Sequence, residues 1–390
     1  MSVAAPQIAP ARPPRTKVSA RTVFARVEVV PDPAAALEIL RGFAPDAAGS
    51  FYQSEIFLQA WLENCAAQDR ATPFFIVARD EAGAPVALLP LGLFRVGPLR
   101  VAQFLGGKHS NYNLGLFREE ENWSGRELRA LLQEAARATA GGPHLYRLTN
   151  LPLRWRGGDN PLAKLDHQPA ASRAYATRLP ADGDAFLAGR LSADTRKKLR
   201  KKEKRLAGSA TLRHMRAAGA DEKQKVLDAF FRQKSGRTGW RLSEAEAEAR
   251  RRFFAALAAG EGGLELHALA LDDKIIAVFG AGASGDRMQG LFISYDPDPE
   301  FAKSSPGEIL LTRVLRDACA RQFSAFDLGV GDARYKAAFC DEAETLVEAL
   351  YAPTAAGRLA LPVFSLAAHM KKAIKRRPRL LALARKFRRP

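Results

Sequence analysis

Cysteine is scarce in this sequence and forms no spaced motif. The 390 residues contain three cysteines, Cys65, Cys319 and Cys340, and each lies far from the others along the chain. This scarcity excludes a disulfide framework and zinc sites of the CxxC type, and it is typical of proteins from a reducing compartment. We therefore expect a cytoplasmic protein without a bound metal.

Long apolar runs are also missing. No stretch approaches the roughly 18 uninterrupted apolar residues that a membrane-spanning helix needs. The first twenty residues are rich in Pro and Arg and lack the apolar core of a secretory signal. Hydrophobic residues make up 47% of the chain and charged residues 26%, which is typical of a globular protein. At about 100–200 residues per domain, the length predicts two or three domains.

The common motifs of nucleotide, metal and hydrolase sites are absent as well. The sequence contains no Walker, HExxH or GxSxG motif, and none of its six histidines is paired at a spacing of four. The segment 329–334 begins like a glycine-rich dinucleotide fingerprint, but its sixth position is Arg334 instead of glycine. These absences argue against phosphate-loop, zinc-protease, dinucleotide and serine-hydrolase chemistry.

What the chain does have is positive charge, concentrated in three segments. Sixty Lys and Arg against 42 Asp and Glu give a formal net charge of +18. Residues 369–390 contain ten basic residues and no acidic one, 190–205 contain nine against two, and 1–30 contain five against one. Such segments attract nucleic acid, anionic lipid headgroups or phosphorylated ligands.

The two termini are expected to differ in character. Residues 1–28, rich in Pro, Ala and basic residues, predict a disordered basic segment. In the tail 353–390, Leu366, Met370 and Ile374 recur every four residues, and the pattern repeats after a proline. This spacing predicts two short basic amphipathic helices suited to an anionic membrane surface. A solvated basic tail with its apolar residues docked on the protein is the alternative.

The same order of elements occurs twice between the two termini. Helical periodicity, three apolar strands, a further helix and a further strand follow one another over 54–151, and again over 220–331. Such a repeat predicts an internal duplication. Because the central strands are joined by short turns, we expect a mixed α/β fold with mostly antiparallel sheets flanked by helices, in domains 29–178 and 179–352.

The segment 304–311, SSPGEILL, is the most informative local motif. Ser305 is a good N-cap, and Glu308 three residues later completes a capping box. Gly307 permits close approach of a ligand to the backbone, and Lys303 adds a cation. A helix start of this kind binds phosphates. It is also what an ordinary well-capped helix looks like, and both interpretations remain open.

A second motif, 326–336, combines two acids with a tyrosine and a lysine. Asp327 lies within a short predicted strand, and Asp332 is placed to cap the helix that holds Tyr335 and Lys336. The glycine turn between the two acids puts proton donors and acceptors beside the possible phosphate loop. The alternative is a helix cap and a core tyrosine.

Three further segments carry polar or basic side chains that could contact a substrate. The first is 230–240, which would bind an acidic or sugar-like acceptor, and the second is 109–113, which would line a cleft between domains. The third, 194–207, is a strongly basic helix that is either solvated or a projecting arm that meets phosphates. The residues singled out in the first two are Lys234, Arg237 and Trp240, and Asn111, Tyr112 and Asn113.

Several of these segments, taken in order, resemble one family. FYQSEIFLQAW, LRVAQFLGG with SNYN, the RKKLRKKEKRL helix, SPGEILL and FDLGVGDARYKAAFCD are similar to bacterial acyltransferases described as CelD-like or BioF2-like. These belong to the GNAT superfamily and are relatives of the FemAB peptidyltransferases. The resemblance covers about residues 50–350 and implies two tandem GNAT-like domains.

The resemblance also implies a donor site and a proton donor. An acyl-CoA such as acetyl-CoA would place its pyrophosphate at the loop before the 306–320 helix, where this chain has Lys-Ser-Ser-Pro-Gly in place of the usual Arg/Gln-x-x-Gly-x-Gly/Ala. Tyr335 matches the location of the tyrosine that protonates the leaving thiolate in superfamily members. We further expect backbone N–H groups over 292–295, where the predicted strand opens, to polarise the thioester carbonyl. The donor-binding residues implied are Tyr295, Lys303, Ser304, Ser305 and Gly307.

The function expected from this resemblance is transfer of an acyl group from acyl-CoA to an amine or hydroxyl. The acceptor would be a sugar, a polysaccharide or a cell-envelope precursor, with Asp327 or Asp332 taking its proton. Two alternatives remain open: aminoacyl transfer from charged tRNA, as in FemAB proteins, and a non-catalytic, membrane-associated role in exopolysaccharide or cellulose biosynthesis.

Overall fold

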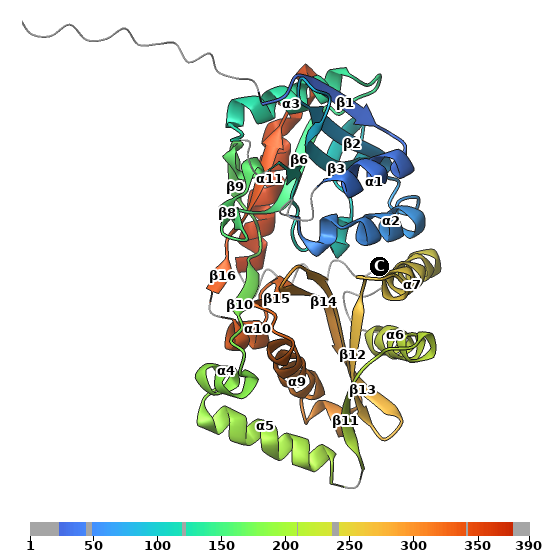
Figure 1. Ribbon diagram of the computed structural model, residues 1–390, viewed down its shortest axis with the longest axis vertical. Helices are drawn as coiled ribbons and strands as arrows, with labels where there is room; N and C mark the ends of the chain where they lie inside the picture. Colours follow the sequence, from blue (N-terminus) through green and yellow to red (C-terminus); the bar gives the residue numbers. More distant parts are fainter. Residues whose placement is uncertain are drawn as a thin grey trace, which may run out of the picture.

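Two β-sheets, each made mostly of antiparallel strands and flanked by helices, form the framework of the chain (Figure 1). The structure is a computed structural model that describes residues 23–43, 49–118, 122–208, 210–235, 242–340 and 342–376. This architecture confirms the predicted mixed α/β fold. No helix in these ranges is long and apolar enough to cross a bilayer.

The first sheet has the strand order β1-β2-β3-β4-β6-β17-β9, with the short β5 paired to β3. Its strands are β1 Arg26–Val30, β2 Thr72–Arg79, β3 Pro85–Val96, β4 Leu99–Phe104, β5 Leu116–Phe117, β6 Leu145–Pro152, β9 His167–Pro169 and β17 Leu346–Tyr351. The helices of this half are α1 Pro33–Gly42, α2 Glu55–Asn64, α3 Gly125–Arg137 and the 3₁₀ turns η1 Phe51–Gln53, η2 Gly107–His109 and η3 Pro161–Lys164. A small separate hairpin joins β7 Arg154–Trp155 to β8 Gly158–Asp159.

The second sheet has the order β11-β12-β13-β14-β15-β10-β16. Its strands are β10 Ala174–Arg178, β11 Leu212–Arg216, β12 Glu265–Leu271, β13 Lys274–Ser284, β14 Arg287–Tyr295, β15 Ala325–Val330 and β16 Glu342–Glu344. The remaining helices are α4 Gly183–Arg190, α5 Ala193–Leu206, α6 Ala220–Lys234, α7 Glu244–Ala259, α8 Pro299–Ala302, α9 Pro306–Ala320, α10 Arg334–Phe339 and α11 Ala355–Arg376.

The two sheets repeat one topology, as the duplicated sequence pattern predicts. Each has a run of antiparallel strands followed by one parallel pair, β4 with β6 in the first sheet and β14 with β15 in the second. The strand next to each parallel pair comes from elsewhere in the chain. The first sheet receives β17 from near the C-terminal end, and the second receives β10 from the segment that connects the halves.

This strand exchange bears on the predicted domain limits. The division at residue 178 assigns β10 to the first half, yet its hydrogen bonds lie in the second sheet. Residues 26–28 were expected in the disordered N-terminal segment, but they begin β1, which pairs with β2. Residues 1–22 lie outside the described residues.

Local sequence signals explain most element boundaries. Ser54, where the predicted helical periodicity begins, accepts a hydrogen bond from the Phe57 N–H and starts α2. The α1 helix was missed, although Asp32 accepts from the Ala35 N–H and Pro33 occupies the first helical position. The tail forms one helix, α11, which continues through Pro362, whereas the predicted second tail helix lies outside the described residues.

The two halves share a hydrophobic core. Helix α2 of the first half packs against α7 of the second, with the rings of Phe57 and Phe253 at a centroid distance of 5.5 Å. One buried cluster contains residues from α2, α6, α7 and β12, together with Leu346 of β17. Because strands are exchanged and the core is shared, neither half has a complete sheet and core of its own.

This sharing predicts that the chain unfolds as one unit. Leu346 is buried at 1% exposure, so Leu346→Ala should lower the free energy of unfolding by about 2–5 kcal/mol through the cavity that it leaves. Calorimetry should show a single transition moved to lower temperature. The neighbouring exposed Thr345→Ala should change stability by less than about 0.5 kcal/mol. Two separate transitions, with only one affected, would show that the halves are independent.

Candidate active site

The parallel strands β14 and β15 separate partway along their length. They pair only between Arg287–Gln289 and Ala325–Asp327, and beyond these residues the ladder ends. On its other edge β14 pairs with β13, where the register shifts so that Leu291 has no partner. A bulge of this kind frees backbone groups from the ladder, and bulges are frequent beside active sites. The result is an opening in the sheet with free backbone polar groups on its wall.

Asn111, from the first half of the chain, spans this opening. Its Nδ2 donates to the Gly290 carbonyl of β14 at 3.1 Å and to the Tyr52 hydroxyl at 2.7 Å. Its Oδ1 accepts from the Val330 N–H of β15 at 3.3 Å. Gly329 lies against this amide with a φ of +71°, and a Cβ there would collide with Asn111. One side chain therefore bridges the two strands where they part.

A cavity of about 260 Å³ lies along the opening; we call it the strand cavity. Tyr335 of α10 lines it, and burial together with the nearby Cys340 raises the tyrosine pKa to about 12. The hydroxyl therefore keeps its proton at neutral pH, as a proton donor must. The other lining residues are Asn111, Lys234, Phe279, Gly290, Leu291, Phe292, Ile293, Leu328, Val330 and Lys336.

Lys336 has a supporting position in the strand cavity. Its Nζ donates to the carbonyls of Gly329 at 3.2 Å and Val330 at 3.0 Å, at the end of β15. Burial lowers the pKa of this lysine, while the charge of Asp327 opposes the shift. These bonds hold the strand end in place beside Tyr335.

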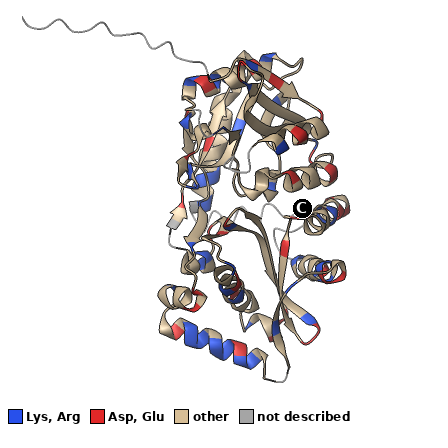
Figure 2. Cartoon of the chain, in the orientation of Figure 1, with Lys and Arg blue, Asp and Glu red and all other residues tan. Residues whose placement is uncertain are grey.

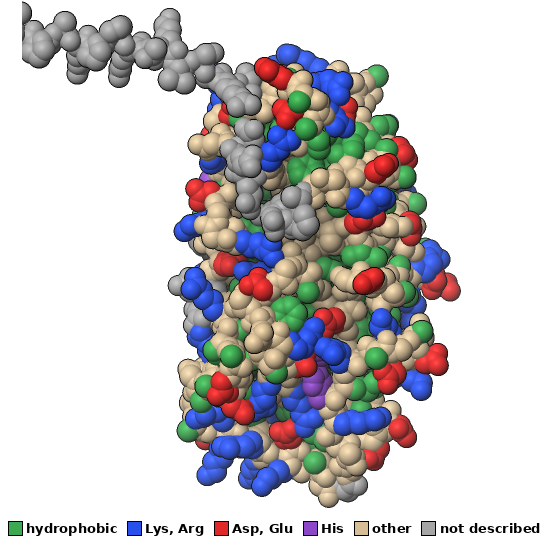
Figure 3. All heavy atoms as spheres, in the orientation of Figure 1, with side chains coloured by type: hydrophobic (Ala, Val, Ile, Leu, Met, Phe, Trp, Pro, Cys, Tyr) green, Lys and Arg blue, Asp and Glu red, His purple; other side chains and the backbone are tan. Residues whose placement is uncertain are grey.

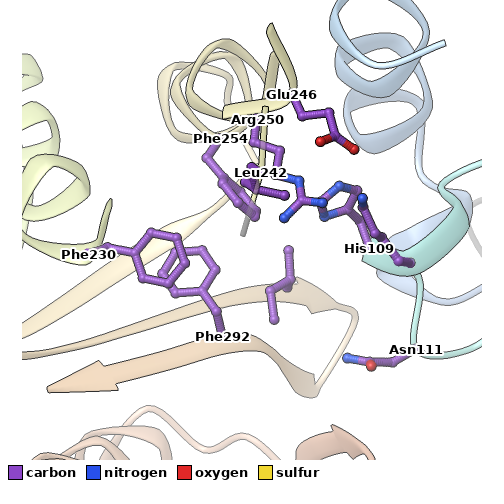
Figure 4. Close-up of a pocket in the computed structure, with 10 residues that line it drawn as sticks. His109, Asn111, Phe230, Leu242, Glu246, Arg250, Phe254 and Phe292 are labelled. Carbon is purple, nitrogen blue, oxygen red and sulfur yellow. The ribbon is translucent and has the colours of Figure 1, made fainter. Parts of the chain in front are cut away.

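A second cavity, of about 380 Å³, lies between the two halves; we call it the interface cavity (Figure 4). Its aromatic side is built from Phe292 of β14, whose ring lies 4.0 Å from that of Phe230 and 4.9 Å from that of Phe254. The remaining lining residues are Lys108, His109, Asn111, Leu242, Glu246, Arg250 and Leu291. Because Asn111, Leu291 and Phe292 line both cavities, the two adjoin at the bulge of β14.

The polar side of the interface cavity holds two cations, Arg250 and Lys108, and the carboxylate of Glu246. Arg250 of α7 is buried, and Figure 4 shows its guanidinium directed toward His109. Burial, with the charges of Arg250 and Lys108, lowers the pKa of His109 to about 3, so the imidazole is neutral at physiological pH. Burial also lowers the pKa of Arg250, which the carboxylates of Glu246 and Asp69 counter. The cavity thus combines aromatic rings with two cations.

The start of α9 does not carry the predicted capping box. Ser305 has a left-handed backbone, with φ 53°, and its hydroxyl caps no helix N–H. The Oγ of Ser305 instead accepts from Lys202 Nζ at 2.7 Å. The Oγ of Ser304 accepts from Arg205 at 2.8 Å, and Arg205 also donates to the Lys303 carbonyl at 2.9 Å. A non-glycine residue in this conformation is uncommon and requires such support from its surroundings.

The basic helix α5 packs on the start of α9 along one side, so it is not a projecting arm, while most of its charged side chains are exposed, as expected of a solvated helix. Leu206 of α5 is buried and Leu199 packs on the same core as α9. Lys and Arg cover most of the helix (Figure 2), and basic side chains gather at this end of the surface (Figure 3). Three cations, Lys202, Arg205 and Lys303, thus lie at one strand-to-helix loop.

The two predicted acids are engaged elsewhere. Asp327 is buried, accepts from Arg287 at 3.0 Å and from the Gly329 N–H at 2.6 Å, and lines neither cavity. Arg287 also donates to Glu344, whose pKa is raised by burial. The predicted cap at Asp332 is wrong, because this carboxylate accepts from the Tyr175 hydroxyl at 2.7 Å and α10 has Ala333 at its N-cap.

The other predicted site residues divide into those near the cavities and those away from them. Asn111, Lys234, Tyr335 and Lys336 meet in the strand cavity. Tyr295 lies at the end of β14, beside Gly307 of the α9 start. Tyr112 and Asn113 are buried in the first half and line neither cavity. Arg237 and Trp240 lie outside the described residues.

Several residues at these sites were missed from the sequence. The charge on α5 was noted, but nothing local distinguishes Lys202 and Arg205 from their basic neighbours. Arg250 gave a usable signal, since it falls on the buried face of α7 with Ala249, Phe253 and Phe254. A charged residue on an apolar helix face is seldom fully buried unless it is paired. No cluster of metal-ligating side chains occurs in the ranges that the structure describes.

Comparisons with known proteins bear on the second half and on the fold of the chain. Residues 193–337 match a family model described as an acetyltransferase (GNAT) domain, and they include β14, α9, β15 and Tyr335. The chain is similar in structure to FemX, with 11% identity, a TM-score of 0.56 and coverage of 88% of this chain and 99% of that one. It is also similar to L-PGS from Bacillus licheniformis, with 14% identity, a TM-score of 0.50 and coverage of 89% and 98%.

A tandem GNAT protein from the clavulanic acid biosynthesis pathway aligns with a TM-score of 0.49 and 14% identity, covering 84% of this chain and 99% of that one. No curated protein matches the sequence. At these identities the similarity to FemX and L-PGS shows a shared fold. Residues 193–337 of the second half match the GNAT domain model, and the narrower resemblance to CelD-like and BioF2-like proteins stays a prediction.

The bridge formed by Asn111 can be tested by removing it. Asn111→Ala removes the acceptor of the partly buried Val330 N–H and leaves the Gly290 carbonyl with the Tyr52 hydroxyl at 3.4 Å, and a buried group that loses its partner costs about 1–3 kcal/mol. Urea unfolding should therefore show a loss of about 1–3 kcal/mol. Asn122→Ala, an exposed amide of the same half, is the control. Equal stability of the two variants would contradict the bridge.

The neutral His109 predicts a specific loss of stability in acid. Its pKa is about 3 in the folded chain, while the unfolded chain binds the proton near pH 6.5, so the free energy of unfolding falls as the pH drops below 6.5. His109→Gln should remove roughly 1–2 kcal/mol of the loss between pH 7 and pH 5. Chemical denaturation at both pH values measures it, with His369→Gln, exposed on α11, as the control. The same acid loss in both variants would show that His109 does not contribute.

Proposed function

We propose that the chain is an acyltransferase that moves an acyl group from acyl-CoA to an amine or hydroxyl. The observation that carries the proposal is the opening between β14 and β15, which holds a protonated Tyr335 and adjoins a separate cavity between the halves. An acyl donor and an acceptor could meet there from opposite sides of the bulge in β14.

The donor phosphates belong at the start of α9. Lys202, Arg205 and Lys303 supply positive charge, and the first turn of a helix offers N–H groups to an anion. The N–H of Glu308 already donates to the Ser305 carbonyl, whereas the Gly307 N–H has no acceptor among the described residues. The loop departs from the glycine-rich pattern usual in the superfamily, and cations from α5 take the place of some backbone donors.

The acyl group would then enter the strand cavity. Backbone groups freed at the Leu291 bulge are placed to polarise the thioester carbonyl. The acceptor nitrogen or oxygen attacks the carbonyl carbon, a new bond to that atom forms, and the carbon–sulfur bond breaks. Tyr335 gives its proton to the leaving thiolate, and the proton lost by the acceptor returns to Tyr335 through water. This route uses neither Asp327 nor Asp332 as a base, because Asp327 is paired with Arg287 and Asp332 accepts from the Tyr175 hydroxyl.

The acceptor would occupy the interface cavity. Its aromatic rings suit the apolar face of a sugar ring, and Arg250 with Lys108 suits an acidic group on the same molecule. These features support an acidic glycan or cell-envelope precursor as acceptor. Both halves then contribute to the acceptor site, with Lys108 from the first and the aromatic rings and Arg250 from the second, whereas the donor site lies in the second half.

Aminoacyl transfer from charged tRNA is a second candidate, favoured by one observation. Helix α5 carries eight basic residues beside the proposed phosphate loop, more than one CoA needs. RNA binding would fall steeply as salt rises, with a slope set by the number of phosphates contacted. Binding of a CoA ester depends less on salt, and this difference separates the two donors.

Calorimetric titration with acetyl-CoA and an assay of thiol release test the proposal together. Tyr335→Phe should keep donor binding and lower turnover by about 10²–10⁴-fold, because only the proton donor is lost. Arg205→Ala should weaken acetyl-CoA binding about tenfold through the lost charged contact.

Lys201→Ala, on an exposed position of α5, is the matched control and should bind acetyl-CoA normally. Absence of acetyl-CoA binding, with tight salt-sensitive binding of charged tRNA, would replace the first candidate by the second. Full turnover in Tyr335→Phe would remove the proposed proton donor.

A further inference from the structure

Helix α11 presents a stripe of large apolar side chains to solvent. Leu359, Val363, Leu366 and Met370 are 83%, 67%, 61% and 55% exposed. They account for four of the seven exposed large hydrophobic side chains in the part of the chain that the structure describes. Their spacing of four, three and four residues puts all of them on one face of the helix. We call this face the apolar stripe.

The rest of α11 is fixed to the protein, so the stripe faces outward in a defined direction. Leu361 and Phe364 pack against a buried cluster of Val101, Leu145 and Ala352. Near the other end, Lys375 Nζ donates to Ser172 Oγ at 2.5 Å. Figure 1 shows α11 lying along the first sheet beside β6, which it also contacts together with β17. The helix is thus an integral part of the fold.

The charge on α11 is of one sign. Residues 355–376 include no Asp or Glu, and their basic side chains are Arg358, Lys371, Lys372, Lys375 and Arg376. The sequence from 377 to 390 adds six Lys and Arg and again no acidic residue. The apolar stripe therefore leads into the most basic segment of the chain.

We propose that the apolar stripe docks on an anionic lipid bilayer together with the basic side chains of α11 that follow it, Lys371, Lys372 and Lys375. The helix would then lie in the plane of the bilayer surface. Exposed Leu, Val and Met side chains bury into the boundary between headgroups and acyl chains, and Lys and Arg pair with acidic headgroups. The proposal is independent of the acyl transfer, because α11 contributes no residue to either cavity.

Two other occupants fit the stripe less well. The same spacing suits packing against a second copy of the helix, but two copies would bring only positive charge together, without acidic partners. Nucleic acid would satisfy the charge yet leave the exposed apolar side chains in water. An anionic bilayer is the partner that satisfies both features.

Sedimentation of the full chain with vesicles tests this docking. At about physiological ionic strength, the chain should bind phosphatidylcholine vesicles that contain about a third phosphatidylglycerol at least tenfold more tightly than pure phosphatidylcholine vesicles. The double variant Val363→Glu with Leu366→Glu should lose at least tenfold in affinity for the anionic vesicles. Leu153→Glu, at a 41% exposed leucine of the first half, is the matched control and should bind like the unchanged chain.

Thermal unfolding of each variant establishes that it is folded, since the changed side chains are exposed. Equal binding by the double variant and the control overturns the proposal. So does a dimer in the unchanged chain that the double variant abolishes, because the stripe would then be covered by a second copy. Binding of duplex DNA at the same salt, unaffected by the double variant and lost in Lys371→Glu with Lys372→Glu, would make the surface one for nucleic acid and would equally overturn it.

Discussion

The amide of Asn111 is the contact on which the arrangement of the site depends. It comes from the loop after β4, in the first half, and it binds both strands of the second sheet where they separate. Gly329 has no Cβ and a left-handed backbone, so that the amide fits against it. The opening in the second sheet is therefore maintained by the first half, and the two cavities meet at the residue that maintains it.

An ion pair network centred on Arg287 lies next to this region. Arg287 lies between the carboxylates of Asp327 and Glu344, and its guanidinium lies 4.6 Å from the Trp155 ring of the first half. Asp327 in turn accepts from the Gly329 N–H, which fixes the turn that Asn111 contacts. Asp327, which the sequence suggested as a catalytic acid, thus helps to set the geometry around Tyr335 and the bulge. Its charge is paired, as buried charges must be.

Local sequence patterns predicted much of the fold. The features that they did not predict depend on contacts between residues far apart in the sequence. The alternation of strands and helices, the duplication and the start of α2 at Ser54 all depend on neighbouring residues, so the sequence predicted them correctly. Ser305 failed as a cap because its partner, Lys202, lies 103 residues earlier. Asp332 failed in the same way, with its partner Tyr175 157 residues away. The strand exchange could not be predicted, because the local sequence of β10 and β17 does not indicate which sheet each strand joins.

The place of β17 also has a consequence for synthesis on the ribosome. The chain emerges from its N-terminal end, and domains generally fold in that order. The slot between β6 and β9 stays empty until residues 346–351 have been made, well after the other strands of the first sheet. An unpaired strand edge of β6 is a site for mistaken pairing with other chains. The nascent protein therefore has a period in which its first sheet is open at β6.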